Sequence, residues 1–263
     1  MKRFKIMLLF FILFSLLFSS GKTGRVEARD FKVYGYSTPD QGEMEVSYWV
    51  DYFIKGNDLP YPFFGKSVDK DKLWRHTVEV EYGVTDRWTL AYYADFEQPK
   101  DEDFKYVQSR AVFLRYRLFE PGQRFFDTTV YFEYYLPNHN YSENEKLETK
   151  IILEKNAGPL QIKLNPIFDK HLSGDDVGEG LEFEYAAGVY LKGLGAITPG
   201  LEFYGKMGEI GNLKSPNEQQ HFIFPVIKAV ISKHVDIDLG LGFGLTGQSD
   251  DLVVKGIFSY AYN

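Results

Sequence analysis

The sequence predicts an all-β protein, a transmembrane antiparallel up-and-down β-barrel of about 12 strands. Apolar residues alternate with polar or small ones in segments of about ten residues along most of the chain. Short and long connections follow each other in regular order between these segments. The chain also begins with an apolar segment that is typical of exported proteins. Together these three features indicate a barrel in the outer membrane.

The clearest alternation lies at the C-terminal end of the chain. From Val235 to Leu245 every second residue is large and apolar, and the residues between are aspartates and glycines. After a polar turn, residues Leu252 to Tyr262 alternate again and end in aromatic residues. A period of two predicts two strands. A face of acids and glycines behind an apolar face is typical of a wall with lipid outside and water inside.

Residues 1–28 have the features of a cleaved signal peptide. A short basic segment precedes an uncharged run from Ile6 to Phe18, which is shorter than the roughly 20 residues that a membrane-spanning helix needs. Val26-Glu27-Ala28 fits the small-x-small cleavage pattern, and Ser20 is a second candidate position. We therefore expect export through the inner membrane and a location in the outer membrane of a Gram-negative cell.

The composition argues against several other classes of protein. Without residues 1–28 the chain has 25 basic and 36 acidic residues, a net charge of −11, so nucleic acid is not an expected partner. There is no cysteine, which excludes disulfides. No further apolar run of about 18 residues follows, so a membrane-embedded chain must be a closed barrel. The aromatic share of 17% suits aromatic belts at membrane interfaces, although a soluble β-sandwich or lectin can have it too.

The barrel domain is predicted to comprise residues 44–263, and residues 29–43 before it are expected to be a periplasmic lead-in or a partial plug. Most strands have close to the 9 to 11 residues that a tilted strand uses to cross a bilayer. The predicted strands are Met44–Phe53, Trp74–Tyr82, Trp88–Phe96, Ser109–Phe119, Phe126–Leu136, Leu147–Lys155, Leu160–Phe168, Leu181–Tyr190, Ile197–Lys206, His221–Ile231, Val235–Leu245 and Leu252–Tyr262.

Connections between the predicted strands alternate in length. Gly83–Arg87 is a tight turn, whereas Ile54–Leu73 is long and polar, and this order continues to the C-terminus. An even-stranded barrel with both termini in the periplasm has short periplasmic turns and longer outer loops. Pro166, Pro199 and Pro225 fall inside predicted strands. Because proline cannot donate to the ladder, we expect bulges or shifted strand boundaries there.

Two segments resemble a family of outer-membrane barrels. Glu81–Tyr93 (EYGVTDRWTLAYY) and Gly240–Val254 (GLGFGLTGQSDDLVV), with the aromatic strand after it, are similar to proteins of the MetA-pathway of phenol degradation type. The resemblance implies uptake of small hydrophobic or aromatic solutes and assigns no binding residue. Such barrels commonly end on an aromatic residue that the insertion machinery reads, whereas here Asn263 follows Tyr262. The expected partners are outer-membrane lipid and lipopolysaccharide, the insertion machinery through the last strand, and small solutes.

The strand faces opposite the apolar residues predict the lining of the lumen, and acids outnumber bases on them. The predicted lumen-lining charged residues are Glu79, Glu81, Asp95, Arg115, Arg117, Asp127, Glu133, Glu182, Glu184, Glu202, Lys206, Asp236 and Asp238. Five aromatic residues, Trp49, Phe113, Tyr131, Tyr135 and Tyr204, are expected to narrow the passage. Acidic walls favour a cation-preferring channel. The alternative is a charged network that plugs the bore of a structural, non-conducting barrel.

We predict that the protein is not an enzyme and has no cofactor, metal or catalytic residue. An outer-membrane lipid hydrolase needs a serine nucleophile beside a histidine. His76 with Ser109 is a candidate pair near one rim, but neither lies in a Gly-x-Ser-x-Gly motif. Asp169–Asp176 offers oxygen ligands for a hard cation and lacks the closing glutamate of a calcium loop. A solvated acidic loop is therefore expected there.

Overall fold

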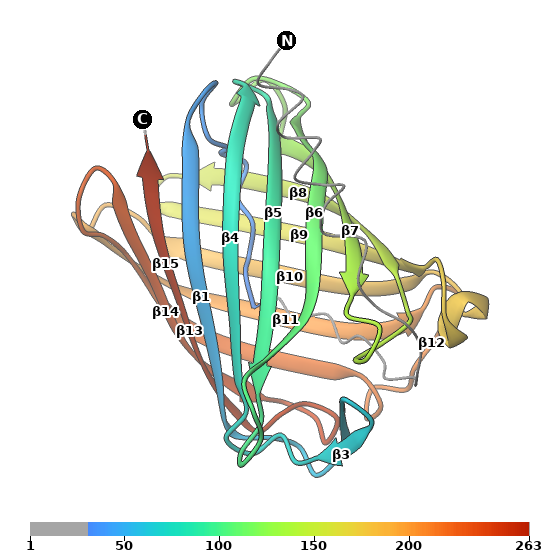
Figure 1. Cartoon of the computed structure of the whole chain (residues 1–263). Helices are drawn as coiled ribbons and strands as arrows, with labels where there is room; N and C mark the ends of the chain where they lie inside the picture. Colours follow the sequence, from blue (N-terminus) through green and yellow to red (C-terminus); the bar gives the residue numbers. More distant parts are fainter. Residues whose placement is uncertain (1–30, 263) are drawn as a thin grey trace.

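The computed structural model describes residues 31–262, so the predicted signal peptide, residues 1–28, lies outside the described residues. In this part of the chain, twelve long strands form one closed antiparallel sheet (Figure 1). Each strand pairs with the next barrel strand in sequence, and β1 (Met44–Lys55) closes the ring by pairing with β15 (Leu252–Tyr262). The predicted twelve-stranded antiparallel barrel is confirmed. Among residues 31–262 no helix is long and apolar enough to span a membrane.

The other barrel strands agree with the predicted segments to within four residues at each end. Several run further on the side of the long loops, because the backbone ladder continues beyond the stretch in which apolar residues alternate. These strands are β4 (Trp74–Thr85), β5 (Trp88–Gln98), β6 (Lys105–Arg117), β7 (Asp127–Pro137), β8 (Lys146–Ala157), β9 (Leu160–His171), β10 (Glu182–Leu191), β11 (Ile197–Glu209), β13 (Gln220–Val230) and β14 (Val235–Gly244).

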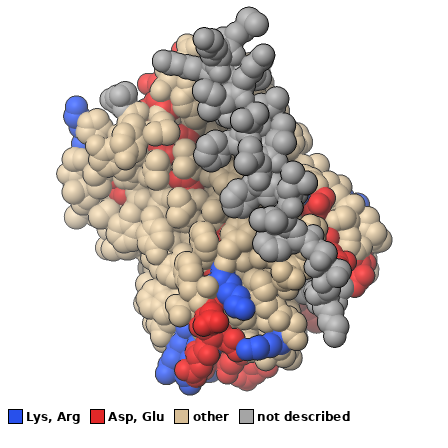
Figure 2. Space-filling view, viewed as in Figure 1, with Lys and Arg blue, Asp and Glu red and all other residues tan. Residues whose placement is uncertain are grey.

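Apolar side chains cover the outside of the barrel, and polar ones face the inside. In β4, Val78 and Val80 are 41% and 37% exposed, whereas Glu79 between them is fully buried. A soluble protein has the opposite arrangement, because it places charged residues toward water and apolar residues in the core. In Figure 2 most charged side chains in view gather at the bottom, over the loops, and most of the wall above them is uncharged. This distribution matches a wall that faces lipid.

Connections of different length lie at opposite ends of the barrel, as predicted. Met44 pairs with Tyr262, so the barrel strands begin and end at the same rim, which we call the turn rim. At the other rim, the loop rim, the connection after β1 contains a small hairpin of β2 (Tyr61–Phe63) and β3 (Lys66–Val68). The two-residue strand β12 (Asn212–Leu213) pairs with the end of β11 at the same rim.

A bulge in β6 reverses the alternation within that strand. The pairing with β7 shifts register between Val112 and Leu114. Arg110 and Arg115 are both buried inside the barrel, although in a regular strand an even and an odd position would face opposite sides. Phe113, at the bulge, is 49% exposed on the outside. The expectation that Phe113 narrows the lumen is wrong, because a bulge adds one residue to the strand and turns every residue before it to the other face.

None of the three prolines within strands produces the expected bulge, and Pro199 lies in an unbroken ladder with β13. The β8–β9 ladder is interrupted beside Pro166, and the β13–β14 ladder is interrupted beside Pro225. The ladders beside Pro166 and Pro225 resume in the same register. Proline removes one hydrogen-bond donor without adding a residue, so the strand keeps its alternation.

The inward glycines of β14 make room for large side chains of the two neighbouring strands. A Cβ atom at Gly242 would lie 2.1 Å from the Phe224 ring in β13, and one at Gly240 would lie 2.8 Å from Lys255 in β15. The glycines therefore let aromatic and long basic side chains lie flat against the inner wall.

We predict that a charge on the outer wall strongly destabilises the protein. Val80→Arg, near the middle of β4, is expected to lower the free energy of unfolding by about 2 to 4 kcal/mol in lipid vesicles, because the guanidinium would lie among acyl chains. The control is Val177→Arg, since Val177 is an exposed residue of a connecting loop. Denaturant titration of the vesicle-inserted proteins measures both. Equal costs for the two variants would contradict a lipid-facing wall.

Candidate functional site

Charged side chains of alternating sign form a continuous belt along the inner face of β5 to β9. Each is at most 2% exposed, and a charge that is removed from water requires a partner of opposite sign. The contacts of this belt are Asp95–Arg110 (2.9 Å), Arg110–Glu133 (3.3 Å), Glu133–Lys150 (3.9 Å), Lys150–Glu148 (2.6 Å), Glu148–Lys146 (3.9 Å) and Lys146–Asp169 (2.7 Å).

A second charged cluster lies on β11, β13, β14 and β15. Glu202 forms ion pairs with Lys228, at 3.2 Å, and with Lys255. Lys228 also pairs with Asp238 at 2.6 Å. The Tyr190 hydroxyl donates a 2.6 Å hydrogen bond to Glu202. The acids of this part of the wall are therefore bound to bases.

The structure places most of the predicted lumen residues in these networks. Glu81 pairs with Arg115 at 2.9 Å, and Glu184 lies 3.7 Å from Lys206. Asp236 is an exception, because it is exposed near the turn rim. Buried are Glu79, Glu81, Asp95, Arg115, Glu133, Glu184 and Glu202; half-buried are Arg117, Asp127, Glu182, Lys206 and Asp238.

Sequence reasoning missed Arg110, Lys146 and Asp169, which belong to the belt. The bulge in β6 hides the inward position of Arg110. Lys146 and Asp169 lie in strand ends that the apolar alternation does not reach. A second bulge, between Gly83 and Thr85, also shifts the pairing of β4 with β5. Arg75 consequently lies opposite Glu97 and forms an ion pair with it at 2.9 Å.

The N-terminal segment of residues 31–40 lies inside the barrel, and we call it the plug (Figure 1, the trace before β1). At its centre, the Tyr34 backbone N–H donates to the Asn165 side chain at 2.8 Å, and the Asn165 amide donates back to the Tyr34 carbonyl at 3.2 Å. The Tyr34 ring packs on Tyr131, with centroids 5.2 Å apart, and its hydroxyl is 3.4 Å from that of Tyr93. Tyr34 thus contacts β5, β7 and β9 at once.

Side chains of the wall also satisfy the rest of the plug backbone. Arg115 donates to the carbonyl of Gly35 at 3.2 Å and to that of Ser37 at 2.7 Å. The Tyr36 N–H donates to Glu154 at 3.0 Å. These bonds replace the ladder partners that an extended segment lacks when no strand lies beside it.

The inner end of the plug has an aromatic contact and an ionic one. The Phe31 ring lies 4.7 Å from the ring of Phe224, and its carbonyl accepts a 2.9 Å hydrogen bond from Lys255. The Lys32 ammonium lies 3.1 Å from Glu79 and 4.5 Å from the centre of the Trp49 ring. The two contacts tie the end of the plug to the walls on both sides of the lumen.

The plug leaves the barrel across the turn rim. Gly42 donates a backbone hydrogen bond to Gly83 at 2.8 Å, and Gly83 donates one to Glu43 at 3.0 Å. A Cβ atom at Gly83 would lie 2.0 Å from the carbonyl oxygen of Asp40. Because that contact is with backbone, only glycine lets the plug pass at this position.

Loops cover the opposite, loop rim of the barrel. Tyr61 of the β2–β3 hairpin is buried, and its hydroxyl bonds to Glu97 at 2.6 Å and to the Tyr141 hydroxyl at 2.8 Å. Phe63, Val107 and Tyr141 form a small apolar cluster beside it. The plug enters from the turn rim and its inner end reaches toward this cover, because Val33 belongs to the same apolar cluster as Tyr61.

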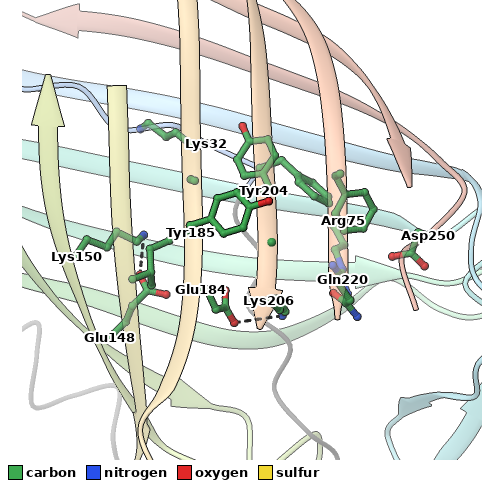
Figure 3. A pocket seen from close by; sticks show the side chains of 15 residues that line it. Lys32, Arg75, Glu148, Lys150, Glu184, Tyr185, Tyr204, Lys206, Gln220 and Asp250 are labelled. Carbon is green, nitrogen blue, oxygen red and sulfur yellow. Dashed lines mark ion pairs between the residues drawn. The ribbon is translucent and has the colours of Figure 1, made fainter. Parts of the chain in front are cut away.

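A small cavity lies within the lumen beside the plug (Figure 3). Its volume of about 50 Å³ has room for a few water molecules. Phe31 and Lys32 of the plug line it, as do Arg75 and Asp250 near the loop rim. Figure 3 also shows the Glu148–Lys150 and Glu184–Lys206 pairs beside it. A cavity of this size does not hold an ordinary solute.

The chain shares its fold with outer-membrane barrels of known structure. An outer membrane channel from Pseudomonas putida F1 has a TM-score of 0.61 and 13% identity, over 90% of this chain and 100% of the channel. The KdgM porin has a TM-score of 0.55 and 9% identity, over 83% of this chain and 99% of the porin. At these identities the likeness concerns the fold.

Comparison of the sequence with known families adds nothing to this. No family model matches the chain, and no curated protein matches it. The resemblance to the phenol-degradation barrels therefore stays a prediction.

The candidate catalytic histidine, His76, lies among aromatic side chains on the outer face of β4. Its Nδ1 atom is 2.6 Å from the Tyr48 hydroxyl, and its ring stacks 6.0 Å from that of Trp74. Phe104 packs against the same imidazole at 5.4 Å. Such a cluster near one rim is typical of the aromatic girdle of a membrane barrel.

We predict that the belt depends on Arg110. Arg110→Met would leave Asp95 and Glu133 without their shared guanidinium inside the wall, at an expected cost of about 3 to 5 kcal/mol in the free energy of unfolding. The control is Lys66→Ala, because Lys66 forms an ion pair with Glu102 in an exposed loop, and such pairs contribute at most about 1 kcal/mol. Urea titration in detergent measures both costs. Similar values would show that the belt does not stabilise the barrel.

Proposed function

We propose that the protein is an outer-membrane channel for small solutes and that it rests in a closed state, with residues 31–40 as its plug. The observation that supports this most is the binding of the plug backbone by polar side chains of the wall, above all by Asn165. The apolar outer face supports the membrane location, and the fold shared with a channel and a porin is consistent with the function.

The chemistry of the plug contacts favours reversible closure. The plug backbone is held by hydrogen bonds with groups that water can also solvate, and each contributes a net of about 0.5 to 1.5 kcal/mol. If the plug left, water would replace it on Asn165, Arg115 and Glu154. The polar contacts can exchange with water at little cost, whereas release of Phe31, Val33 and Tyr34 exposes apolar surface, which favours the closed state at rest.

The walls behind the plug favour small aromatic solutes. Trp49, Tyr93 and Tyr131 are covered by the plug and would present ring faces to the lumen without it. The charged belt beside these rings supplies hydrogen-bond donors and acceptors for a polar substituent. This supports the solute class that the resemblance implies.

The alternative function is a structural barrel that never conducts. The dense belt of ion pairs and the cavity of about 50 Å³ are the observations in its favour. The two functions can be distinguished by whether the plug can move. A barrel with a permanently filled lumen would carry no current even after plug contacts are removed by mutation.

Asn165→Ala is predicted to raise the open fraction of the channel. It removes both hydrogen bonds to the Tyr34 backbone, so an expected loss of about 1 to 3 kcal/mol in plug binding corresponds to a rise of about 5- to 150-fold. Single-channel recording in planar bilayers measures it. Asn217→Ala is the matched control, since Asn217 is an exposed residue of the loop between β12 and β13.

Deletion of residues 29–40 should give lasting conductance in the same recordings. The deleted protein must first show the heat-dependent gel mobility of a folded barrel. A folded deletion variant without current or solute flux into liposomes would favour the structural alternative and refute the channel.

Removal of the plug is also predicted to expose a negative charge that selects cations. Glu79 lies beside Lys32 in the closed state, and deletion of residues 29–40 removes this ammonium. The open variant should therefore prefer cations in a KCl gradient, and adding Glu79→Gln should move its reversal potential toward zero. Asp101→Asn, on an exposed loop, should leave the potential unchanged. A reversal potential that Glu79→Gln does not alter would remove Glu79 from the selective part of the path.

A further inference from the structure

Three potential metal ligands come together at the loop rim, away from the plug. His171 is the last residue of β9, and the short 3-10 helix η1 (Asp175–Gly178) turns the following loop back toward it. His171, Asp176 and Glu179 each offer one ligand atom, and these atoms all lie within 4.8 Å of one another. The three residues span only nine positions, so the loop itself creates the cluster.

His171 shows a separate sign that a ligand belongs here. Its side chain is only 5% exposed, and its Nδ1 atom has no hydrogen-bond partner among residues 31–262. A buried polar atom without a partner costs free energy, and most such atoms in folded proteins are satisfied. Neutral imidazole nitrogen is among the commonest metal ligands in proteins, so a cation would satisfy this atom.

Asp176 is held in position by a neighbouring loop. The Asn144 side chain, which is buried, donates a 2.6 Å hydrogen bond to one oxygen of the Asp176 carboxylate. Ligating carboxylates are usually oriented by a hydrogen bond of this kind. A Cβ atom at Gly174 would lie 1.8 Å from the Asn144 side-chain oxygen, so the two loops pack closely here. The carboxylate therefore has a fixed direction before any cation binds.

We propose that His171, Asp176 and Glu179 bind one divalent transition-metal ion, with Zn²⁺ as the best-fitting probe. One imidazole nitrogen with two carboxylate oxygens is a ligand set that zinc accepts, with a water molecule or solute in the fourth position. Donor atoms around a tetrahedral zinc ion lie about 3.4 Å apart, given bonds of about 2.1 Å. Small side-chain rotations bring the three donors from their present separation to that distance. Calcium fits less well, because it prefers oxygen ligands only.

A neighbouring acidic group is a weaker candidate for the same ion. Asp169, Glu182 and Glu184 also offer ligand atoms within 4.8 Å of one another. However, Lys146 donates a 2.7 Å hydrogen bond to Asp169, and Lys206 lies 3.7 Å from Glu184. These ammonium groups lie against the carboxylates themselves. At the first group, Lys170 donates to the backbone carbonyls of Val177 and Glu179, and no basic side chain within residues 31–262 forms an ion pair with Asp176.

A bound ion would fasten the loop of residues 172–181 to the end of β9 at the mouth of the barrel. The sequence alone favours a solvated acidic loop at residues 169–176, because the histidine at its centre is not recognisable as buried. The proposal does not depend on conductance, since it concerns the loop rim and not the plug.

The test is zinc binding to the full-length mature protein, folded in detergent and stripped of metal with a chelator. Isothermal titration calorimetry should show one Zn²⁺ ion per chain. His171→Ala should weaken binding by more than about 100-fold, and Asn144→Ala by about 10-fold because it loosens Asp176. His139→Ala is the matched control, since His139 is an exposed histidine of the neighbouring loop, and it should leave the affinity unchanged.

Cobalt provides a second readout that does not depend on any variant. Co²⁺ bound to the unaltered protein should give the visible absorption of a low-coordinate nitrogen and oxygen site, and Zn²⁺ should abolish it in competition. If His171→Ala loses the gel mobility of a folded barrel, His171→Gln is used in its place. Absence of stoichiometric binding, equal binding by the His171 variants, or binding that is lost with Glu182→Gln and kept without His171 would each overturn the proposal.

Discussion

The structure depends on one constraint: with the plug in place, the inside of this closed barrel is rich in charged and polar groups and leaves only a small cavity for water. Charges and backbone groups that face inward must therefore find partners in the protein. The belt from Asp95 to Asp169 meets this need by alternating the sign of charge from one side chain to the next. The plug meets it in the same way, since Asn165 and Arg115 bind its backbone. Wall and plug are parts of a single polar interior.

The outer wall obeys the opposite constraint, and this explains how much of the fold could be predicted. Lipid accepts only apolar side chains, so apolar and polar residues must alternate along each strand. The pattern along Val235–Leu245 can therefore be recognised from the sequence alone. The alternation fails as a guide at bulges, which leave no mark in composition. One extra residue at Phe113 was enough to hide Arg110, the residue that joins two acids of the belt.

The plug and the loop rim were less predictable for a different reason. Residues 31–40 form no ladder, so they have no period, and the sequence left open whether they lead into the barrel or fill it. Their partners, such as Asn165 and Glu154, lie more than a hundred residues away. Nothing local distinguishes an asparagine that binds a plug from one that faces water. Likewise, the burial of His171 follows from the way one loop packs on another, which residue order does not encode.

The two closures of the lumen differ in chemistry, and this difference indicates which one moves. At the loop rim, Phe63, Val107 and Tyr141 exclude water from an apolar cluster, and exposing them would lose the hydrophobic contribution that holds the hairpin in place. The plug backbone is held by polar contacts that water can replace, and Phe31, Val33 and Tyr34 add apolar contacts to them. Gln220 and Asp250 line the cavity near the loop rim, so one side of the barrel mouth is polar. A solute could pass on this side while the apolar cluster stays closed. A solute path would then run between the vacated plug position and this polar side, with the β2–β3 hairpin left in place.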